Sequence, residues 1–172
     1  QAGLNLPLVT DKAALRIAGA IRTRDGFIEG PTGVESNTVD RMTLRGQGLF
    51  DFGSAGELRL IGDYTEGDDA CCHAIWLQDG ATVNFPAFGL PANGGAPNVG
   101  ADALDELRSN DGQFDTPFET WGVSAEYNVD TPIGDLTCIG SYRDFESRTA
   151  LETDFTQLRI FTVGASDQAR AL

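Results

Sequence analysis

Apolar and polar residues alternate along several segments of the chain, each about ten residues long. Residues 120–129 show the alternation most cleanly, with apolar side chains at the odd positions and polar or small ones at the even positions. A period of two indicates a β-strand whose two faces meet different surroundings. The same pattern predicts strands over residues 14–23, 41–52, 57–65, 120–129 and 136–145, and a β-rich run that alternates poorly predicts a sixth near 157–165.

The connections between these segments differ greatly in length. Residues 53–56 (Gly-Ser-Ala-Gly) and 130–135 (Asp-Thr-Pro-Ile-Gly-Asp) predict tight turns, whereas 24–40, 66–119 and 146–156 are longer. If consecutive strands run in opposite directions, every long connection leaves the sheet at the same end. Outer-membrane barrels have this asymmetry, and most of the segments have the roughly 9–11 residues that a tilted strand needs to cross a bilayer. The sequence therefore predicts an all-β, antiparallel up-and-down meander that forms part of a transmembrane β-barrel with long extracellular loops.

Aromatic residues on the apolar face fall near the ends of the predicted strands. Those at the end with the long connections are Tyr64, Trp121 and Tyr142, and those at the end with the short turns are Phe50, Phe52 and Tyr127. Two bands of rings are typical of the two interfaces of a membrane-spanning barrel. The alternative is that these are ordinary core aromatics near strand ends.

The chain has 172 residues and a formal net charge of −14. Nucleic acid is therefore a poor partner, because binding to phosphates needs a basic surface. Much of the acidity lies in residues 66–119, which indicates a solvated loop; attraction of a cationic ligand, or of lipopolysaccharide bridged by calcium, is the alternative. Within that loop, residues 102–108 predict a short helix. No apolar run approaches the roughly 20 residues of a membrane-spanning helix.

Few residues suggest chemistry. Cys71 and Cys72 are adjacent, and they could form a vicinal disulfide, pair elsewhere or have no function. His73 follows them, but fewer than four well-spaced ligands are present, so we expect no metal site. Residues 53–56 lack the spacing of a nucleophile elbow, and a catalytic triad would have to use His73, the single histidine. We therefore expect neither a cofactor nor enzymatic activity.

Several segments resemble TonB-dependent receptors. Residues 7–30 resemble the start of the barrel in that family, where a "G-P-L-V-x-D-K-x-A-x-R" turn leads into a strand ending "R-D-G-F-I", although Leu6 stands where glycine is usual. The resemblance continues in residues 45–47, 58–64, 120–124 and 141–147, and it depends more on their order and spacing than on any one motif. It covers about residues 4 to 156 and then fades, and residues 165–172 look like a ragged end.

The resemblance implies active uptake of a scarce nutrient, such as a siderophore, cobalamin or a saccharide, across the outer membrane of a Gram-negative bacterium. The implied partners are outer-membrane lipid, the nutrient at the extracellular loops, and the TonB complex through a plug domain that is not recognisable in this chain. Because such barrels have about 22 strands, residues 1–172 are expected to be one partial barrel of five or six strands, a fragment of the receptor. The alternative is a soluble all-β carbohydrate-binding module, which would bury the apolar face between two sheets.

Overall fold

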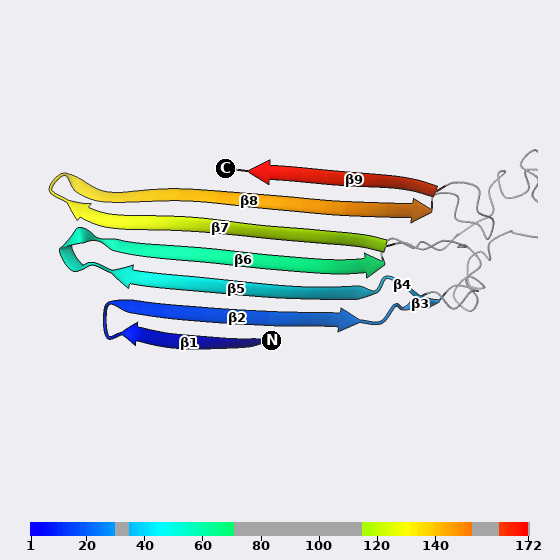
Figure 1. Ribbon diagram of the computed structural model, residues 1–172, viewed down its shortest axis with the longest axis horizontal. Coiled ribbons are helices and arrows are strands. Elements are labelled where there is room, and N and C mark those ends of the chain that lie inside the picture. The colour runs from blue at the N-terminus through cyan, green and yellow to red at the C-terminus, as the bar shows by residue number, and fades with distance from the viewer. Residues whose placement is uncertain (30–34, 71–114, 153–161, 172) are drawn as a thin grey trace, which may run out of the picture.

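Seven strands form one antiparallel sheet in the computed structural model, which describes residues 1–29, 35–70, 115–152 and 162–171 (Figure 1). They lie side by side in chain order: β1 (Ala2–Val9), β2 (Ala13–Arg24), β5 (Val39–Asp51), β6 (Glu57–Ala70), β7 (Asp115–Thr131), β8 (Gly134–Glu152) and β9 (Thr162–Ala171). The two-residue strands β3 (Ile28–Glu29) and β4 (Glu35–Ser36) pair separately with each other. The predicted all-β up-and-down meander is confirmed.

The two ends of the sheet differ. β1, β5, β7 and β9 run toward one end, which we call the turn end, and there short turns join β1 to β2, β5 to β6 and β7 to β8 (Figure 1). At the opposite end, the loop end, β2, β6 and β8 finish and β5, β7 and β9 begin. Every connection predicted to be long therefore starts and finishes at the loop end.

The β5–β6 turn shows why the chain reverses where it does. Residues Gly53–Ala55 form one turn of 3₁₀ helix (η1), and the backbone N–H of Gly53 donates to the Asp51 carboxylate at 2.7 Å. Gly53 and Gly56 have φ angles of 64° and 105°, in the region where residues other than glycine are strained. The hydroxyl of Tyr127 on β7 donates to the carbonyl of Ala55, which attaches the turn to the next strand.

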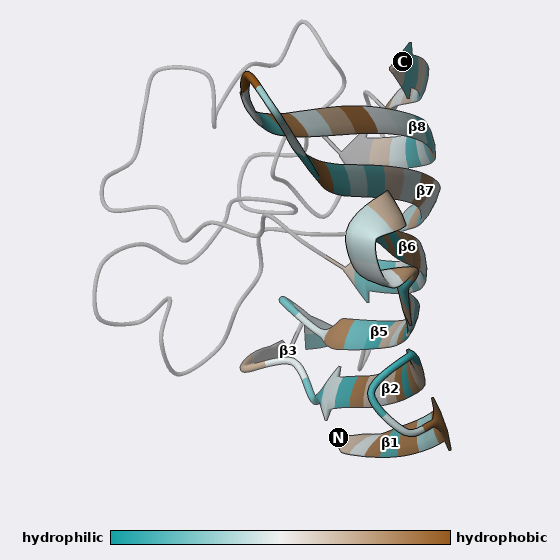
Figure 2. Cartoon of the chain, turned by 90° about the vertical axis from the view of Figure 1, so that its left-hand side faces the viewer, coloured by the Kyte–Doolittle hydropathy of each residue, from teal (hydrophilic) through white to brown (hydrophobic). Residues whose placement is uncertain are grey.

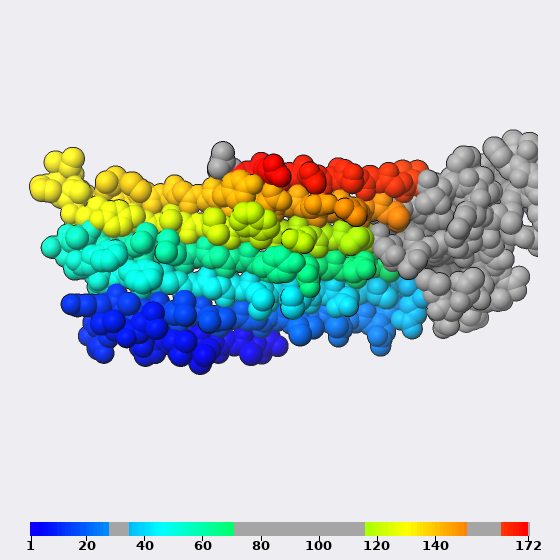
Figure 3. Space-filling view, viewed as in Figure 1, coloured from blue at the N-terminus to red at the C-terminus, as the bar shows by residue number. Residues whose placement is uncertain are grey.

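The described strands of the main sheet form a single layer (Figure 2), and Figure 3 shows one of its two faces. Hydrophobic and hydrophilic residues alternate along the strands in Figure 2. Within the described part of the chain no large apolar side chain is fully buried, and the only polar or charged side chains that are buried are Ser36 and Asp69. The sheet therefore has no apolar core of its own there, and backbone ladders and cross-strand contacts hold it together.

The sheet is open. Among the described strands, β1 pairs only with β2 and β9 pairs only with β8, so the edges do not meet and no closed barrel is formed.

Several sequence-based boundaries were wrong. The main sheet has seven strands in the described ranges rather than five or six, because β1 was missed. The last strand is Thr162–Ala171 rather than 157–165, so residues 165–171 are part of a strand and not a ragged end. β6, β7 and β8 each extend several residues into the segments predicted as loops. The helix predicted over residues 102–108 lies outside the described residues.

Candidate functional site

The strand register places the apolar positions of neighbouring strands on one face. Ile17, Gly46, Gly62, Val123 and Tyr142 form one row across five strands, each opposite the next. We call the apolar surface built from such rows the apolar belt. Its larger members are Leu4, Leu6, Leu15, Ile17, Ile21, Met42, Leu44, Phe50, Leu58, Leu60, Tyr64, Trp121, Val123, Tyr127, Val129, Leu136 and Tyr142.

The belt is largely uncovered. Leu44, Leu60 and Val123 are 48%, 42% and 51% exposed, and Leu15 is half-buried. Folded proteins in water rarely expose a continuous apolar surface of more than a few hundred Å² unless it is an interaction site. The apolar belt is therefore expected to contact an apolar medium or an apolar partner.

Three aromatic rings mark the belt's limit toward the loop end. Tyr64 lies opposite Trp121, and the ring centroids of Trp121 and Tyr142 are 5.3 Å apart. The Tyr64 hydroxyl donates to Glu66 at 2.7 Å and the Tyr142 hydroxyl to Asp144 at 3.3 Å, so both tyrosines direct their polar atoms away from the belt. These three residues were predicted to lie at one end of the strands, and the register brings them together there.

Charged residues replace apolar ones immediately beyond these rings. Glu66, Glu119 and Glu146 form a cross-strand row on the same face as the belt. The Arg170 guanidinium on β9, which lies wholly beyond the belt, donates to Asp144 at 2.7 Å, and this hydrogen bond raises the pKa of Arg170 above its ordinary value. On each of β6, β7 and β8, the next residue on this face beyond the aromatic ring is a carboxylate. The belt therefore has a sharp edge toward the loop end.

That edge crosses the sheet obliquely. The last apolar positions are Ile21 on β2, Met42 on β5, Tyr64 on β6, Trp121 on β7 and Tyr142 on β8. Ile21 pairs with Met42, whereas Tyr142 lies in the row of Ile17, four residues earlier on β2. The edge thus moves by about one residue per strand, or about 3.3 Å for each 4.8 Å of strand spacing, which corresponds to an angle of about 35°.

The aromatics at the turn end are less regular. Phe50, Leu58 and Tyr127 form one row, but the Tyr127 hydroxyl binds the turn backbone. Phe52 follows the end of β5 and is 54% exposed. The register therefore aligns Phe50 with Tyr127, and it places Phe52 in the β5–β6 turn.

The opposite surface, which we call the polar face, contains an ion pair that spans three strands. Asp63 on β6, Gly122 on β7 and Arg143 on β8 form one row. Arg143 extends over Gly122 and donates to both carboxylate oxygens of Asp63, at 2.9 and 2.8 Å. A Cβ atom at position 122 would lie 2.9 Å from the Arg143 Nη2 atom, so glycine leaves the space for this contact.

We expect Gly122→Ala to displace the Arg143 guanidinium and to lower the free energy of unfolding by about 1 kcal/mol, the typical contribution of a partly exposed ion pair. Urea titration in detergent, followed by circular dichroism, measures the change. The same substitution in an Arg143→Ala background should cost much less, because the displaced contact is already absent. An equal loss in both backgrounds would disprove the coupling.

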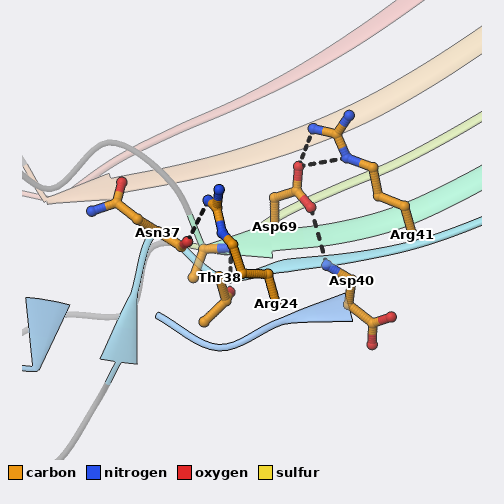
Figure 4. A network of polar contacts seen from close by, with 7 residues as sticks. Arg24, Asn37, Thr38, Asp40, Arg41 and Asp69 are labelled. Atoms are coloured by element: carbon orange, nitrogen blue, oxygen red, sulfur yellow. Dashed lines mark hydrogen bonds and ion pairs between the residues drawn. The ribbon is translucent and has the colours of Figure 1, made fainter. Parts of the chain in front are cut away.

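A polar network joins β5 to β6 at the loop end (Figure 4). The buried Asp69 carboxylate accepts hydrogen bonds from the Arg41 guanidinium, at 2.9 Å from its Nε atom, and from the backbone N–H of Asp40, at 3.3 Å. The Thr38 hydroxyl accepts from the backbone N–H of Ala70 at 3.1 Å, and Arg24 donates to the Asn37 carbonyl at 2.9 Å. The hydrogen bond with Asp69 raises the pKa of Arg41, which lies beyond the belt. This network holds the chain in place where β5 begins.

The structure does not test the candidate cysteines. Cys71, Cys72 and His73 lie outside the described residues. Cys138, on the belt side of β8 opposite Tyr127, is a free exposed cysteine. In the described ranges, no group of three or more His, Cys, Asp or Glu side chains is arranged to hold a metal ion, and no helix is long and apolar enough to cross a membrane.

Two features of the belt were not predicted from the sequence. β1 extends the belt through Leu4 and Leu6, and the glutamate row sharpens its limit. The carboxylates carried a usable signal, because Glu66, Glu119 and Asp144 each lie two residues from a predicted interface aromatic, on the same face and toward the loop end. Comparisons of the chain with protein-family models, with curated proteins and with solved structures found no significant match.

Proposed function

We propose that this chain forms part of the wall of a transmembrane β-barrel in a bacterial outer membrane, with the apolar belt against lipid and the polar face toward the lumen. The observation that carries the proposal is the oblique edge of the belt. Strands of such barrels tilt by about 35–45° from the barrel axis. A flat membrane surface that cuts across strands with this tilt produces a boundary that shifts by about one residue per strand.

The composition of the boundary supports lipid rather than a second protein layer. Aromatic rings gather at membrane interfaces, where one end of the side chain is in an apolar environment and the other is hydrated. Tyr64 and Tyr142 have this arrangement, with the ring at the belt and the hydroxyl on a carboxylate beyond it. The stretch from Trp121 to Val129 also has the length, about 9–11 residues, of a strand that crosses a bilayer.

The two unpaired edges of the sheet, β1 and β9, support the proposal that it is a segment of the wall of a larger barrel. An edge strand presents unpaired backbone N–H and C=O groups, which have no water to bind inside a bilayer. β1, at one edge, lies beside the belt, and Pro7 is its only residue of a type that commonly protects an exposed edge, since the strand has no charged side chain. Additional strands that pair with β1 and β9 would satisfy both edges.

The resemblance of residues 7–30 and of the later segments to TonB-dependent receptors supports the more specific proposal of nutrient uptake. On this proposal the loop end faces the cell exterior and contributes to nutrient binding, and the turn end faces the periplasm. TonB would act through a plug domain. The chain would then be a wall segment of the receptor and would have no catalytic activity.

Quenching of tryptophan fluorescence by brominated lipid tests the lipid contact. In a Trp76→Phe variant folded into bilayers, Trp121 is the sole tryptophan, and bromine on the acyl chains should quench it strongly. The matched control carries Trp76→Phe, Trp121→Phe and Ser124→Trp, because Ser124 lies on the polar face of the same strand. We expect weak quenching there. Equal quenching at both positions, or a chain that stays in buffer without detergent as the carbohydrate-binding alternative requires, would refute the proposal.

A further inference from the structure

A hollow of about 460 Å³ opens near the turn end of the sheet, across β1, β2, β5 and β6. Most of the residues that line it belong to the polar face, because Asn5 pairs with Arg16, Arg16 with Gln47, and Leu49 with Arg59. Ala14 on β2 pairs with Leu49 on β5, and both line the hollow together with Arg16 on β2 and Arg59 on β6. Leu6, Leu15 and Gly48 also line it and have the parity of the apolar belt, so the hollow lies mainly, not wholly, on the opposite face.

The two arginines at this hollow have no polar partner among the residues that the structure describes. In the described part of the chain, Arg41 and Arg143 on the same face each bind a carboxylate, whereas Arg16 and Arg59, like Arg22 and Arg45, make no hydrogen bond or ion pair; of these four, only Arg16 and Arg59 line the hollow. Both side chains are exposed. The hollow thus has two guanidinium groups among its lining residues, neither of them in an ion pair with a described residue, in a chain of net charge −14.

The carboxylates nearest to Arg59 do not occupy this site. Glu126 lies opposite Arg59, but it is on β7, on the side away from the hollow, and its Oε1 atom accepts from Asn128 at 2.9 Å. Glu57 is on the same face as Arg59, two residues nearer the turn end, and forms no ion pair among the described residues. Asp51 is also nearby on the same face, where its carboxylate accepts from the backbone N–H of Gly53, and no carboxylate is among the described residues that line the hollow.

We propose that the hollow binds a small organic dianion, with one carboxylate or phosphate group at Arg16 and the other at Arg59. The guanidinium group presents parallel N–H donors that match the two oxygens of such groups. β5 separates the two arginines, and their register differs by two residues, so their Cα atoms are about 12 Å apart. A ligand that reaches both needs an apolar spacer between its acid groups, and Ala14 and Leu49 provide the surface for that spacer.

The amides of Asn5 and Gln47 add donors and acceptors at the same hollow. Its volume is within the range of sites for small molecules, about 300–1,000 Å³. This site is independent of whether the belt meets lipid, so it extends beyond the proposed function.

Calorimetric titration of the full chain in a nonionic detergent tests the site. The probes are the straight-chain dicarboxylates succinate, adipate and suberate, with hexanoate as a monoanion and pyrophosphate as a compact polyanion. We expect suberate to bind at least tenfold more tightly than hexanoate, succinate or pyrophosphate. Equal affinity for suberate and pyrophosphate, or no binding of any probe, would overturn the proposal.

Three variants assign the contacts. Arg16→Gln and Arg59→Gln should each weaken suberate binding by at least tenfold. Arg22→Gln is the matched control, since Arg22 is another exposed arginine on the polar face of β2 but lies outside the hollow, and it should change binding by less than twofold. An equal effect of all three variants would indicate general charge attraction and reject the site. Absence of binding by a chain whose Trp121 is quenched by brominated lipid would reject this site alone.

Discussion

Leu60→Arg is expected to destabilise the membrane-inserted state by about 2–4 kcal/mol, the cost of an arginine at the lipid-facing midplane of a barrel. Leu60 is exposed near the middle of the apolar belt, between Gly48 on β5 and Ala125 on β7. Neither neighbour offers a charge or a hydrogen-bonding side chain. A guanidinium group placed there would have to lie in hydrocarbon or draw water into the bilayer.

The matched control is Ile61→Arg, one residue further along the same strand. Ile61 has the same number of carbon atoms, but it lies on the polar face between Gln47 and Ser124, so we expect a change of less than about 1 kcal/mol. Urea titration of bilayer-inserted protein, followed by tryptophan fluorescence, measures both. Tyr64→Arg, at the edge of the belt, should cost about 0–1 kcal/mol. If Ile61→Arg proved as damaging as Leu60→Arg, the assignment of the two faces would be wrong.

Gly56→Ala should cost about 3 kcal/mol, the upper end of the range for a residue forced into a sparsely populated backbone conformation. Gly56 has φ 105° and ψ −176°, a combination almost confined to glycine. An added Cβ atom would also lie 2.4 Å from the carbonyl oxygen of Asn128 and 3.0 Å from the Val129 Cβ atom. The backbone of β7 would have to move, which would also disturb the hydrogen bond from the Tyr127 hydroxyl to the Ala55 carbonyl.

Gly53→Ala is the control within the same turn. Its φ angle is 64°, but nothing lies within 4 Å of the added carbon, so only the left-handed backbone conformation is penalised, by about 1 kcal/mol. The difference between the two variants in the midpoint of urea unfolding, followed by circular dichroism in detergent, isolates the clash with β7. Equal midpoints would mean that the β5–β6 turn does not pack against β7.

The sequence predicted the strands well wherever the two faces have different surroundings. The predicted run 14–23 corresponds to β2, Ala13–Arg24, and the run 41–52 corresponds to β5, Val39–Asp51, because apolar and polar residues alternate there. Beyond the belt both faces are polar, so the periodicity disappears although the strand continues. β6 therefore reaches Ala70 and β8 reaches Glu152 without any apolar alternation to indicate it.

The edge strands were the hardest to predict. β1 contains Pro7, which lacks a backbone N–H donor, and the register with β2 shifts between Pro7 and Val9. Proline within a strand is tolerated at an edge or at a bulge such as this register shift, and local sequence does not reveal either position. β9 consists largely of small and polar residues because it pairs with β8 beyond Tyr142. Its neighbours, rather than its own pattern, make it a strand.

The candidate site was only partly predictable. Strand parity identified the aromatic group of Tyr64, Trp121 and Tyr142, because their alignment depends only on the alternation and the turn positions. It did not identify the contact of Arg143 with Asp63, which are 80 positions apart in the chain and meet across Gly122. Such a contact requires the register of two successive strand pairs. The hollow between Arg16 and Arg59 escaped prediction for the same reason.

The directions of the strands limit the number of further strands that could close this sheet into an antiparallel barrel. The two outermost strands, β1 and β9, point in the same direction. A strand added antiparallel to either of them must therefore point in the opposite direction. Only an odd number of further strands can satisfy that condition. Two copies of the sheet joined edge to edge, β9 to β1, would have to pair in parallel at both seams, and a fully antiparallel cylinder cannot be assembled in that manner.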